Sequence, residues 1–381
     1  MDSHKKHTKH AKIPRRSLGM YASSEIAFIG AKCGDIQNLT KQIISNLSDA
    51  FQIGYIDADH ASFDNPEKGD YLEEGAHVFL SDKNETVTLN SLNTSNQFDQ
   101  HIQLNECDLV LVNGNHFEAQ HQILFLDSSK AKSIEKRVNR LTNVLAIVEV
   151  DTTIIPSPVE DVIPNQHNIS RFQYKDTQAI KQFIASWMAE RKPVLNALIL
   201  AGGKSTRMGE NKATMWYQDT IQIERLTTIL QSKVESVFVS CRQDQDIKTD
   251  LPKLYDRVQG AGPLGAITNT FRSFPNQAWL VVACDLPLLD SEVLDQLISS
   301  RSVKHTATAF LNEETGFAEP LITIWEPKSY LRMLQFEALG FTCPRKVLIN
   351  SNTHLIKPKD SAKLMNVNTP EEYQKASKLL G

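Results

Sequence analysis

A chain of 381 residues is long for a single domain and comfortable for two. Apolar residues make up 41% of the chain and charged residues 23%, the proportions of a soluble globular protein, and a net charge of −4 argues against nucleic-acid binding. No apolar run approaches the roughly 18 residues that a membrane-spanning helix needs. The five cysteines are scattered and form no CxxC pair, which indicates reduced thiols in a cytoplasmic protein.

Residues 1–20 are expected to form a disordered basic tail, because they contain almost nothing to bury. The segment also lacks the apolar stretch of a secretory signal. His4, His7 and His10 recur at every third position, which would bring their imidazoles together on a metal if the tail were helical. A solvated basic tail accounts for the same residues without a metal.

Residues 21–192 alternate near-continuous apolar segments with amphipathic ones, a pattern that indicates an α/β domain whose parallel sheet is covered on both faces. The expected strands are residues 25–30, 53–58, 107–114, 122–127 and 143–150, and the expected helices are residues 38–51, 128–141 and 177–192. Residues 151–170 are polar and rich in Pro and Asn, as in a loop.

The first strand, its glycine-containing loop and the following helix suggest a phosphate-binding loop, yet the motif GxxxxGK[ST] is absent. Gly30 and Gly34 are separated by three residues, and Asp35 and Ile36 follow where Lys and Ser or Thr are needed. Without the lysine and the hydroxyl, a triphosphate and its Mg²⁺ each lose a partner. The sequence therefore predicts a P-loop-like three-layer domain with a degenerate phosphate loop.

A second α/β domain is expected over residues 193–381, because Pro193 ends the preceding helix and a fresh apolar segment follows. Its expected strands are residues 194–200, 236–240, 278–285, 306–310, 320–325 and 346–350.

The string LILAGGKSTRMGENK, residues 198–212, carries the most specific chemistry. Its glycines permit a turn whose backbone N–H groups can hold phosphate, and Lys204, Arg207 and Lys212 supply cations for a polyphosphate. A plain strand-to-helix turn with a solvated basic rim is the structural alternative.

This string resembles the signature of the nucleotidyltransferases related to the molybdenum cofactor guanylyltransferases. Three further matches follow in the family's order: YDRVQGAGPLGAI (255–267), VVACDLPLLD (281–290) and NVNTPEEYQKA (366–376). The resemblance covers nearly all of residues 194–381 and implies a Rossmann-like nucleotidyltransferase domain. It also implies transfer of GMP from GTP to Mo-bound molybdopterin, with release of pyrophosphate.

The resemblance assigns roles residue by residue. The implied nucleotide-binding residues are Leu200, Ala201, Gly202, Gly203, Lys212, Ser240, Asp256 and Asp285. Lys212, Asp285 and Arg207 are expected to carry catalysis, with Arg207 and Gly209 facing the triphosphate and Asp285 binding Mg²⁺, the expected cofactor. Ser240 departs from the family, which often has Asn there, so that contact is either lost or mediated by water.

Two of these motifs can also be interpreted from their residues alone, without the resemblance. Asp285 follows a buried strand, so its carboxylate emerges at the sheet edge where α/β proteins bind ligands, and it suits Mg²⁺; a turn aspartate is the alternative. Thr369 and Glu372 are spaced as a helix capping box, with Pro370 at the first helical position. Asn366 and Asn368, just before that helix, are either acceptor-binding residues or turn formers.

The base preference favours GTP, because relatives that use CTP tend to read LAAG and to lack the loop formed here by Gly262, Pro263 and Leu264. The partners implied are GTP, molybdopterin and acceptor molybdoenzymes. The same chemistry on CTP or another phosphorylated acceptor remains an alternative, as does a non-catalytic molybdopterin carrier.

The N-terminal half resembles, more weakly and over about residues 25–150, the small GTP-binding adaptor that accompanies the guanylyltransferase. Asn113 stands where the adaptor has an acidic residue. The resemblance implies a degenerate adaptor-like domain fused to an active transferase, and an unrelated α/β domain is the alternative.

Overall fold

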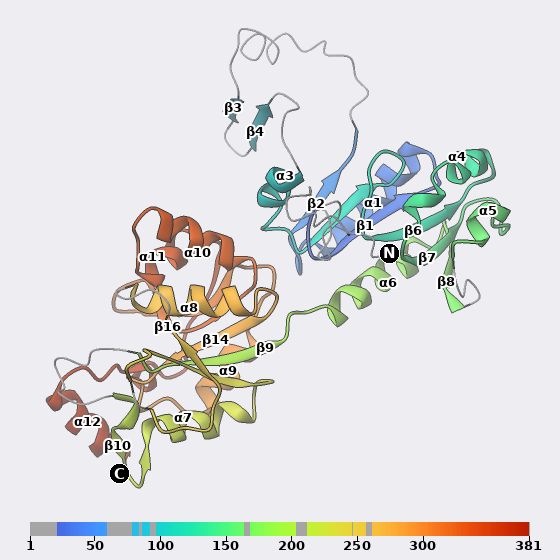
Figure 1. The fold of residues 1–381 in the computed structure, drawn as a ribbon. Coiled ribbons are helices and arrows are strands. Elements are labelled where there is room, and N and C mark those ends of the chain that lie inside the picture. Colours follow the sequence, from blue (N-terminus) through green and yellow to red (C-terminus); the bar gives the residue numbers. More distant parts are fainter. Residues whose placement is uncertain are drawn as a thin grey trace, which may run out of the picture. The chain divides into compact units, whose positions relative to one another are not determined.

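The computed structural model describes residues 21–58, 78–83, 86–91, 97–163, 168–202, 212–245, 247–256 and 261–380. The chain divides into two compact units, and the division falls between Arg191 and Lys192. Each unit has its own sheet and its own hydrophobic cores (Figure 1). Within the described ranges, no helix is long and apolar enough to cross a membrane.

The N-terminal unit is built on a six-stranded sheet in which all neighbouring strands run parallel. The strand order is β2-β5-β1-β6-β7-β8. The strands are β1 (Glu25–Ile29), β2 (Ile53–Ile56), β5 (Leu109–Asn113), β6 (His121–Leu126), β7 (Val144–Glu149) and β8 (Ser170–Gln173). β1, β5 and β6 are buried along their whole length, as a sheet covered on both faces requires.

Helices α1 (Cys33–Leu47) and α6 (Thr177–Glu190) cover one face of this sheet, and α4 (Ala131–Glu135) and α5 (Ser157–Glu160) lie over the other. A separate hairpin of β3 (Val78–Lys83) and β4 (Thr86–Ser91) precedes α3 (Gln97–Gln103). The helix expected at residues 38–51 is present, but α1 begins five residues earlier, at Cys33, and ends at Leu47.

The single helix expected at residues 128–141 was wrong. The structure has three short pieces there, a 3₁₀ turn at Ser128–Lys130, α4, and a 3₁₀ turn at Val138–Arg140. Ile134, Val138 and Leu141 all reach the same hydrophobic cluster. Because the broken path already buries these apolar side chains, a continuous helix is not needed.

The C-terminal unit has a seven-stranded sheet of order β13-β12-β9-β14-β16-β15-β17. The strands are β9 (Leu195–Leu200), β12 (Val237–Cys241), β13 (Lys253–Tyr255), β14 (Ala278–Ala283), β15 (Ala307–Leu311), β16 (Ala318–Trp325) and β17 (Thr353–Ile356). β16 runs antiparallel to both β14 and β15, and the other pairings are parallel. The carboxyl ends of β9, β12 and β14 therefore share an edge with the start of β16.

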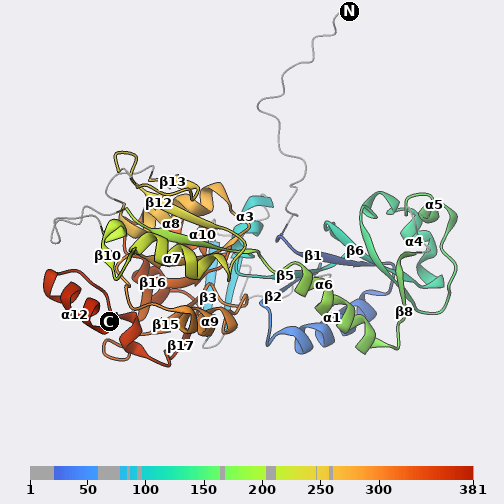
Figure 2. The ribbon, with the colours of Figure 1, turned by 90° about the horizontal axis from the view of Figure 1, so that it is seen from below.

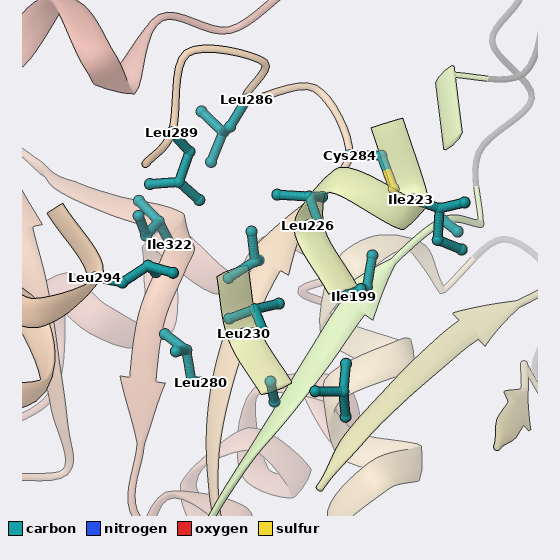
Figure 3. Close-up of a cluster of buried hydrophobic side chains, with 14 of the residues drawn as sticks. Ile199, Ile223, Leu226, Leu230, Leu280, Cys284, Leu286, Leu289, Leu294 and Ile322 are labelled. Atoms are coloured by element: carbon teal, nitrogen blue, oxygen red, sulfur yellow. The ribbon is translucent and has the colours of Figure 1, made fainter. Parts of the chain in front are cut away.

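Two helices, α7 (Gln222–Gln231) and α9 (Ser291–Ser299), pack on one face of this sheet around the core drawn in Figure 3. Helices α8 (Gly262–Ser273), α10 (Ser329–Ala338) and α11 (Pro344–Ile349) pack on the other. The last helix, α12 (Pro370–Leu380), lies beside the small hairpin of β10 (Trp216–Tyr217) and β11 (Thr220–Ile221), as Figure 2 shows.

The strand expected at residues 346–350 was wrong, because residues 346–349 belong to α11 and Asn350 caps it. Pro344 occupies the first turn of that helix, where its fixed φ favours a helical start. Val347 and Leu348 are buried against the α8 and α10 side of the sheet. The edge strand β17 follows only after the helix ends.

Candidate functional site

The backbone expected to face the nucleotide lies at the carboxyl end of β9. The N–H of Ala201 donates to the Ser240 carbonyl oxygen over 2.9 Å, which continues the β9–β12 ladder past Leu200. The Ala201 carbonyl oxygen accepts a 2.8 Å hydrogen bond from the Gln245 side-chain amide. Gln245, which the sequence gave no reason to select, therefore holds the backbone at Ala201.

Ser240 and Asp256 meet on the same side of that loop. The Ser240 hydroxyl donates to Asp256 Oδ1 over 3.0 Å. Burial raises the pKa of Asp256, while the Ser240 hydrogen bond and the charge of Arg242 oppose that rise. A Cβ atom at Gly202 would lie 3.0 Å from Asp256 Oδ2, so only glycine leaves the close approach of loop and carboxylate undisturbed.

Asp285 lies in the turn after β14, between two residues that point into the core, Cys284 and Leu286 (Figure 3). These two anchors fix the position of the Asp285 backbone. Its carbonyl oxygen also accepts a 2.8 Å hydrogen bond from the Val367 N–H, which joins this turn to the segment before α12.

Lys212 contacts two other expected site residues, Asp285 and Asn368. Its Nζ lies 3.5 Å from Asp285 Oδ2 and donates a 2.6 Å hydrogen bond to Asn368 Oδ1. Burial raises the pKa of Asp285, Lys212 opposes that rise, and the negative charge of Glu319 adds to it. An ammonium, a carboxylate and an amide from three distant parts of the sequence therefore form one polar cluster.

Two buried oxygens here, Asp285 Oδ1 and Asn366 Oδ1, have no hydrogen-bond partner among the residues that the structure describes. Unpaired buried oxygens of this kind suit a hard cation. No group of three or more His, Cys, Asp or Glu side chains with metal-site spacing occurs in the described part of the chain. The carboxylate and amide oxygens of Asp285 and Asn366 are the kind of donor that fits Mg²⁺, which usually takes its other ligands from water and substrate phosphates.

The capping box expected at the start of α12 is confirmed. The Glu372 N–H donates to Thr369 Oγ1 over 3.3 Å, and Glu372 Oε2 accepts from the N–H groups of Thr369 and Asn368. Thr369 and Glu372 therefore have a structural role. By holding the Asn368 backbone, they fix the amide that contacts Lys212.

Glu319 is a second acidic residue at the same edge, and sequence reasoning missed it. It lies at the start of β16, is only 8% exposed, and accepts a 2.6 Å hydrogen bond from the Asn312 amide. The only available signal was a carboxylate beside an apolar strand. Its proximity to Asp285 depends on the antiparallel pairing of β16, which the sequence pattern does not specify.

Other expected residues lie outside the described ranges. Gly203, Lys204, Arg207 and Gly209 belong to residues 203–211, and the tail histidines His4, His7 and His10 to residues 1–20.

In the N-terminal unit, the loop between β1 and α1 is closed by side chains. Asn115 Oδ1 accepts from the Gly30 N–H over 3.3 Å, and its Nδ2 donates to the Ala31 carbonyl oxygen over 2.8 Å. Gly30 has a φ of +100°, and a Cβ there would lie 2.5 Å from the Phe125 carbonyl oxygen. The Cys33 thiol lies 3.4 Å from His116 Nε2.

Asn113, at the end of β5, contacts a carboxylate. Its side-chain amide donates to Asp57 Oδ1 over 2.8 Å, and Asp57 Oδ2 accepts from Tyr55 and Gln37. Burial acts to raise the pKa of Asp57, but these hydrogen bonds outweigh it and lower the pKa. The carboxylate at this edge is therefore satisfied by the protein itself.

Comparison with known proteins identifies the C-terminal unit. The model of the MobA-like NTP transferase domain matches residues 197–354. A probable molybdenum cofactor guanylyltransferase from Carboxydothermus hydrogenoformans is 32% identical over 192 residues, which are 49% of this chain and 96% of that protein. The chain belongs to the MobA-like NTP transferases. Members of this family are nucleotidyltransferases, and so is this chain.

Two further similarities extend the comparison. A molybdenum cofactor biosynthesis bifunctional protein from Synechocystis sp. is 35% identical over 182 residues, 47% of this chain, and the match spans about half of that protein, 52%. The crystal structure of molybdopterin-guanine dinucleotide biosynthesis protein A from Archaeoglobus fulgidus matches 48% of this chain and 97% of its own, with 19% identity and a TM-score of 0.42. In this MobA-like transferase, Asn366 and Asn368 lie beyond the residues that the family model matches.

Proposed function

We propose that the protein is a molybdenum cofactor guanylyltransferase, which transfers GMP from GTP to Mo-bound molybdopterin and releases pyrophosphate. The names of its relatives support this activity. The observation that carries the proposal is the cluster of Lys212, Asp285 and Asn368 at the carboxyl edge of the sheet. Open α/β sheets bind their ligands at that edge.

The nucleotide is proposed to bind on the β9–β12 side of the edge. The backbone of Leu200, Ala201 and Gly202 would face the guanine, with Gln245 keeping that backbone in place. Asp256 would hold the nucleotide from the end of β13, and Ser240 orients its carboxylate. Ser240 therefore acts through Asp256 in this proposal, which replaces the direct contact that an asparagine would make.

In the proposed reaction, an oxygen of the acceptor's terminal phosphate attacks the α-phosphorus of GTP. A new P–O bond forms, the bond from the α-phosphorus to the bridging oxygen breaks, and pyrophosphate leaves with that electron pair. Lys212 is placed to neutralise phosphate charge as it shifts to the leaving group, with Arg207 proposed beside it. Bound Mg²⁺, held through Asp285 and Asn366, would supply further charge neutralisation at the phosphates.

Because the chemistry consists mainly of positioning and charge neutralisation, the protein needs no nucleophile of its own. Asn368 contributes by fixing Lys212 through a 2.6 Å hydrogen bond. We propose GTP over CTP because Gly202 leaves the backbone without a side chain where the base would approach, and because Gly262, Pro263 and Leu264 form the GPL segment at the start of α8.

The N-terminal unit is proposed to be a degenerate adaptor-like domain. Its parallel sheet with a central β1, followed by a loop and α1, is consistent with such a domain. Its remaining use would be to dock molybdopterin, an acceptor molybdoenzyme or the transferase unit.

The deciding experiment incubates the protein with Mg²⁺, molybdopterin loaded with molybdenum, and GTP labelled at the α-phosphate. The proposal expects the label in a molybdopterin guanine dinucleotide and an equal amount of pyrophosphate. A parallel reaction with labelled CTP tests the base, and label transfer from CTP alone would replace the guanylyltransferase with a cytidylyltransferase. Molybdopterin binding without any transfer would indicate a carrier.

A further inference from the structure

The acceptor side of the edge lies on the strands that the nucleotide does not use. Asp285 follows β14 in the middle of the sheet, and β9, β12 and β13 lie on one side of it. β16 and β15 lie on the other. With the nucleotide over the first side, an acceptor that attacks from opposite the leaving pyrophosphate has to approach over the second.

The acidic side chain that β16 carries to this edge is Glu319. The antiparallel pairing joins Val282, near the end of β14, to Ile322, so Glu319 at the start of β16 lies at the edge where β14 ends. The charge of Glu319 acts on the Asp285 carboxyl, which agrees with this register. Two carboxylates at one edge repel a phosphate unless a cation lies with them.

Arg345 is the cation that lies against Glu319. Its Nη2 is 3.7 Å from Glu319 Oε2, and its Nε donates to the Ala318 carbonyl oxygen over 3.2 Å. The Arg345 side chain is 38% exposed, and its guanidinium makes no other hydrogen bond to the described residues. Several N–H donors of a planar fork therefore remain available at the edge.

Glu319 itself is held rigidly. Asn312 Nδ2 donates to Glu319 Oε1 over 2.6 Å, while Asn312 Oδ1 accepts from the N–H groups of Glu314 and Thr315 in the turn between β15 and β16. These hydrogen bonds hold the Glu319 carboxylate towards the turn. Glu319 fixes where the guanidinium lies, and the turn fixes the carboxylate.

We propose that Arg345, positioned by Glu319, binds the phosphate monoester of the acceptor and presents it to the nucleotide. This inference rests on the proposed function and assigns the acceptor side of the same site. A guanidinium fork matches two oxygens of a phosphate and leaves the third to attack, whereas a lysine would bind as a point charge. Arg345 is the residue that touches the substrate, and Glu319 is a positioning residue.

The test compares steady-state kinetics of the full chain and four variants, with GTP and Mo-loaded molybdopterin varied in turn. Arg345→Ala is expected to raise the acceptor KM by about 10- to 100-fold, the effect of one lost charged hydrogen bond, and to leave the GTP KM unchanged. Arg345→Lys keeps the positive charge but loses the planar guanidinium. Its acceptor KM should therefore lie between those of the wild type and Arg345→Ala.

The other two variants separate positioning from charge. Glu319→Gln retains the shape of the side chain and should raise the acceptor KM by less than Arg345→Ala, again without moving the GTP KM. Lys357→Ala is the matched control. Lys357 directly follows β17, at the same end of the sheet, and its exposed ammonium pairs with Glu313. Its removal should leave the KM values for GTP and for the acceptor unchanged.

Binding of molybdopterin, followed by its pterin fluorescence without GTP, distinguishes failure of this inference from failure of the proposed function. Transfer by the wild type with the same acceptor KM in Arg345→Ala overturns the role of Arg345 and leaves the function standing. Arg345-dependent binding without any transfer leaves the acceptor site standing and removes the guanylyltransferase. A wild type that neither binds nor transfers overturns both.

Discussion

Asp285 combines properties that rarely occur together in a residue with a purely structural role. It is buried, one of its oxygens lies 3.5 Å from Lys212 Nζ, and the other has no hydrogen-bond partner within the described ranges. A buried oxygen left unpaired costs about 1–3 kcal/mol, so its retention points to a ligand that pairs with it. Its neighbours Cys284 and Leu286 are anchored in the core, so the carboxylate is held in place at the edge.

Asp285→Asn is therefore expected to nearly abolish GMP transfer and to leave the fold intact. The amide has almost the same shape as the carboxylate, but it removes the charge that we propose binds Mg²⁺. Initial rates with labelled GTP measure the loss, and thermal unfolding of the same variant serves as the control for folding. Turnover close to that of the wild type would remove Asp285 from the metal role.

Lys212→Ala is expected to weaken GTP binding by about 1.5–3 kcal/mol and to slow transfer, because a cation near the phosphates acts before and during bond cleavage. The change also leaves Asn368 Oδ1 without its donor. Calorimetric titration of GTP measures the affinity. Lys233→Ala, which breaks the pair with Asp295, is a matched control and should bind GTP as the wild type does. Unchanged affinity in Lys212→Ala would make Lys212 a solvated rim residue.

At the scale of residues, sequence reasoning found those that lie inside distinctive strings. Lys212, Asp285 and Asn368 are far apart in the chain, and the structure brings them into contact. Gln245 and Glu319 were missed because their surroundings in sequence are ordinary. Their importance comes from the strand beside them, and no local spacing encodes that contact.

The elements behind the site depend on local signals at their ends, and α9 is the clearest case. Asp290 caps this helix by accepting a 3.1 Å hydrogen bond from the Val293 N–H, and it also pairs with Lys363. Burial acts to raise the pKa of Asp290, but the bonds from Lys363 and Val293 outweigh it and lower the pKa. The folded state therefore favours the ionised carboxylate.

Asp290→Ala is expected to lower the free energy of unfolding by about 0.5–2 kcal/mol at pH 7, the usual effect of removing a cap. Because the folded pKa lies below the unfolded value of about 3.9, this contribution is complete above that value and is lost as the pH falls through the folded pKa. Urea unfolding at pH 7 and at lower pH measures it. Asp295→Ala, farther along α9, is the control that removes an ion-paired carboxylate, its partner being Lys233, without removing a helix cap. A difference that grows on acidification would contradict the assignment.

Elements were predictable where a cap or a buried run marked them. The capping box at Thr369 and Glu372 located the start of α12, and most of the central strands were located by continuous apolar runs. Residues 346–350 were misread because a short apolar run fits a strand or a buried helix equally well. Pro344, just ahead of the run, was the available signal for a helix.

At the scale of the molecule, both units have a parallel-strand edge with polar groups, but the hydrogen bonding of those groups differs. In the C-terminal unit, Asp285 and Asn366 each have an oxygen without a hydrogen-bond partner in the part of the chain that the structure describes. In the N-terminal unit, Asn115 bonds the Gly30 N–H that would face a phosphate, and Asp57 is satisfied by hydrogen bonds from its neighbours. One edge is left open to ligands, and the other is closed by its own side chains.

The full chain is therefore expected to bind one GTP, at the transferase unit, and residues 20–190 alone should neither bind nor hydrolyse it appreciably. A phosphate loop needs backbone N–H groups, a lysine and a hydroxyl on Mg²⁺, and Asp35 and Ile36 occupy the positions of the last two. What remains is the start of α1, whose dipole contributes only about 0.3–1 kcal/mol towards an anion.

Calorimetric titration of GTP with Mg²⁺ gives the number of sites in the full chain and the affinity of the fragment. The fragment retains the cores that cover both faces of its sheet, so circular dichroism and a cooperative thermal transition are expected to show that it is folded. Since Asn115 has to leave the Gly30 N–H before phosphate can take its place, the cost of displacement adds to the missing charge. Two sites in the full chain, or a micromolar dissociation constant for the folded fragment, would make this loop a working phosphate site.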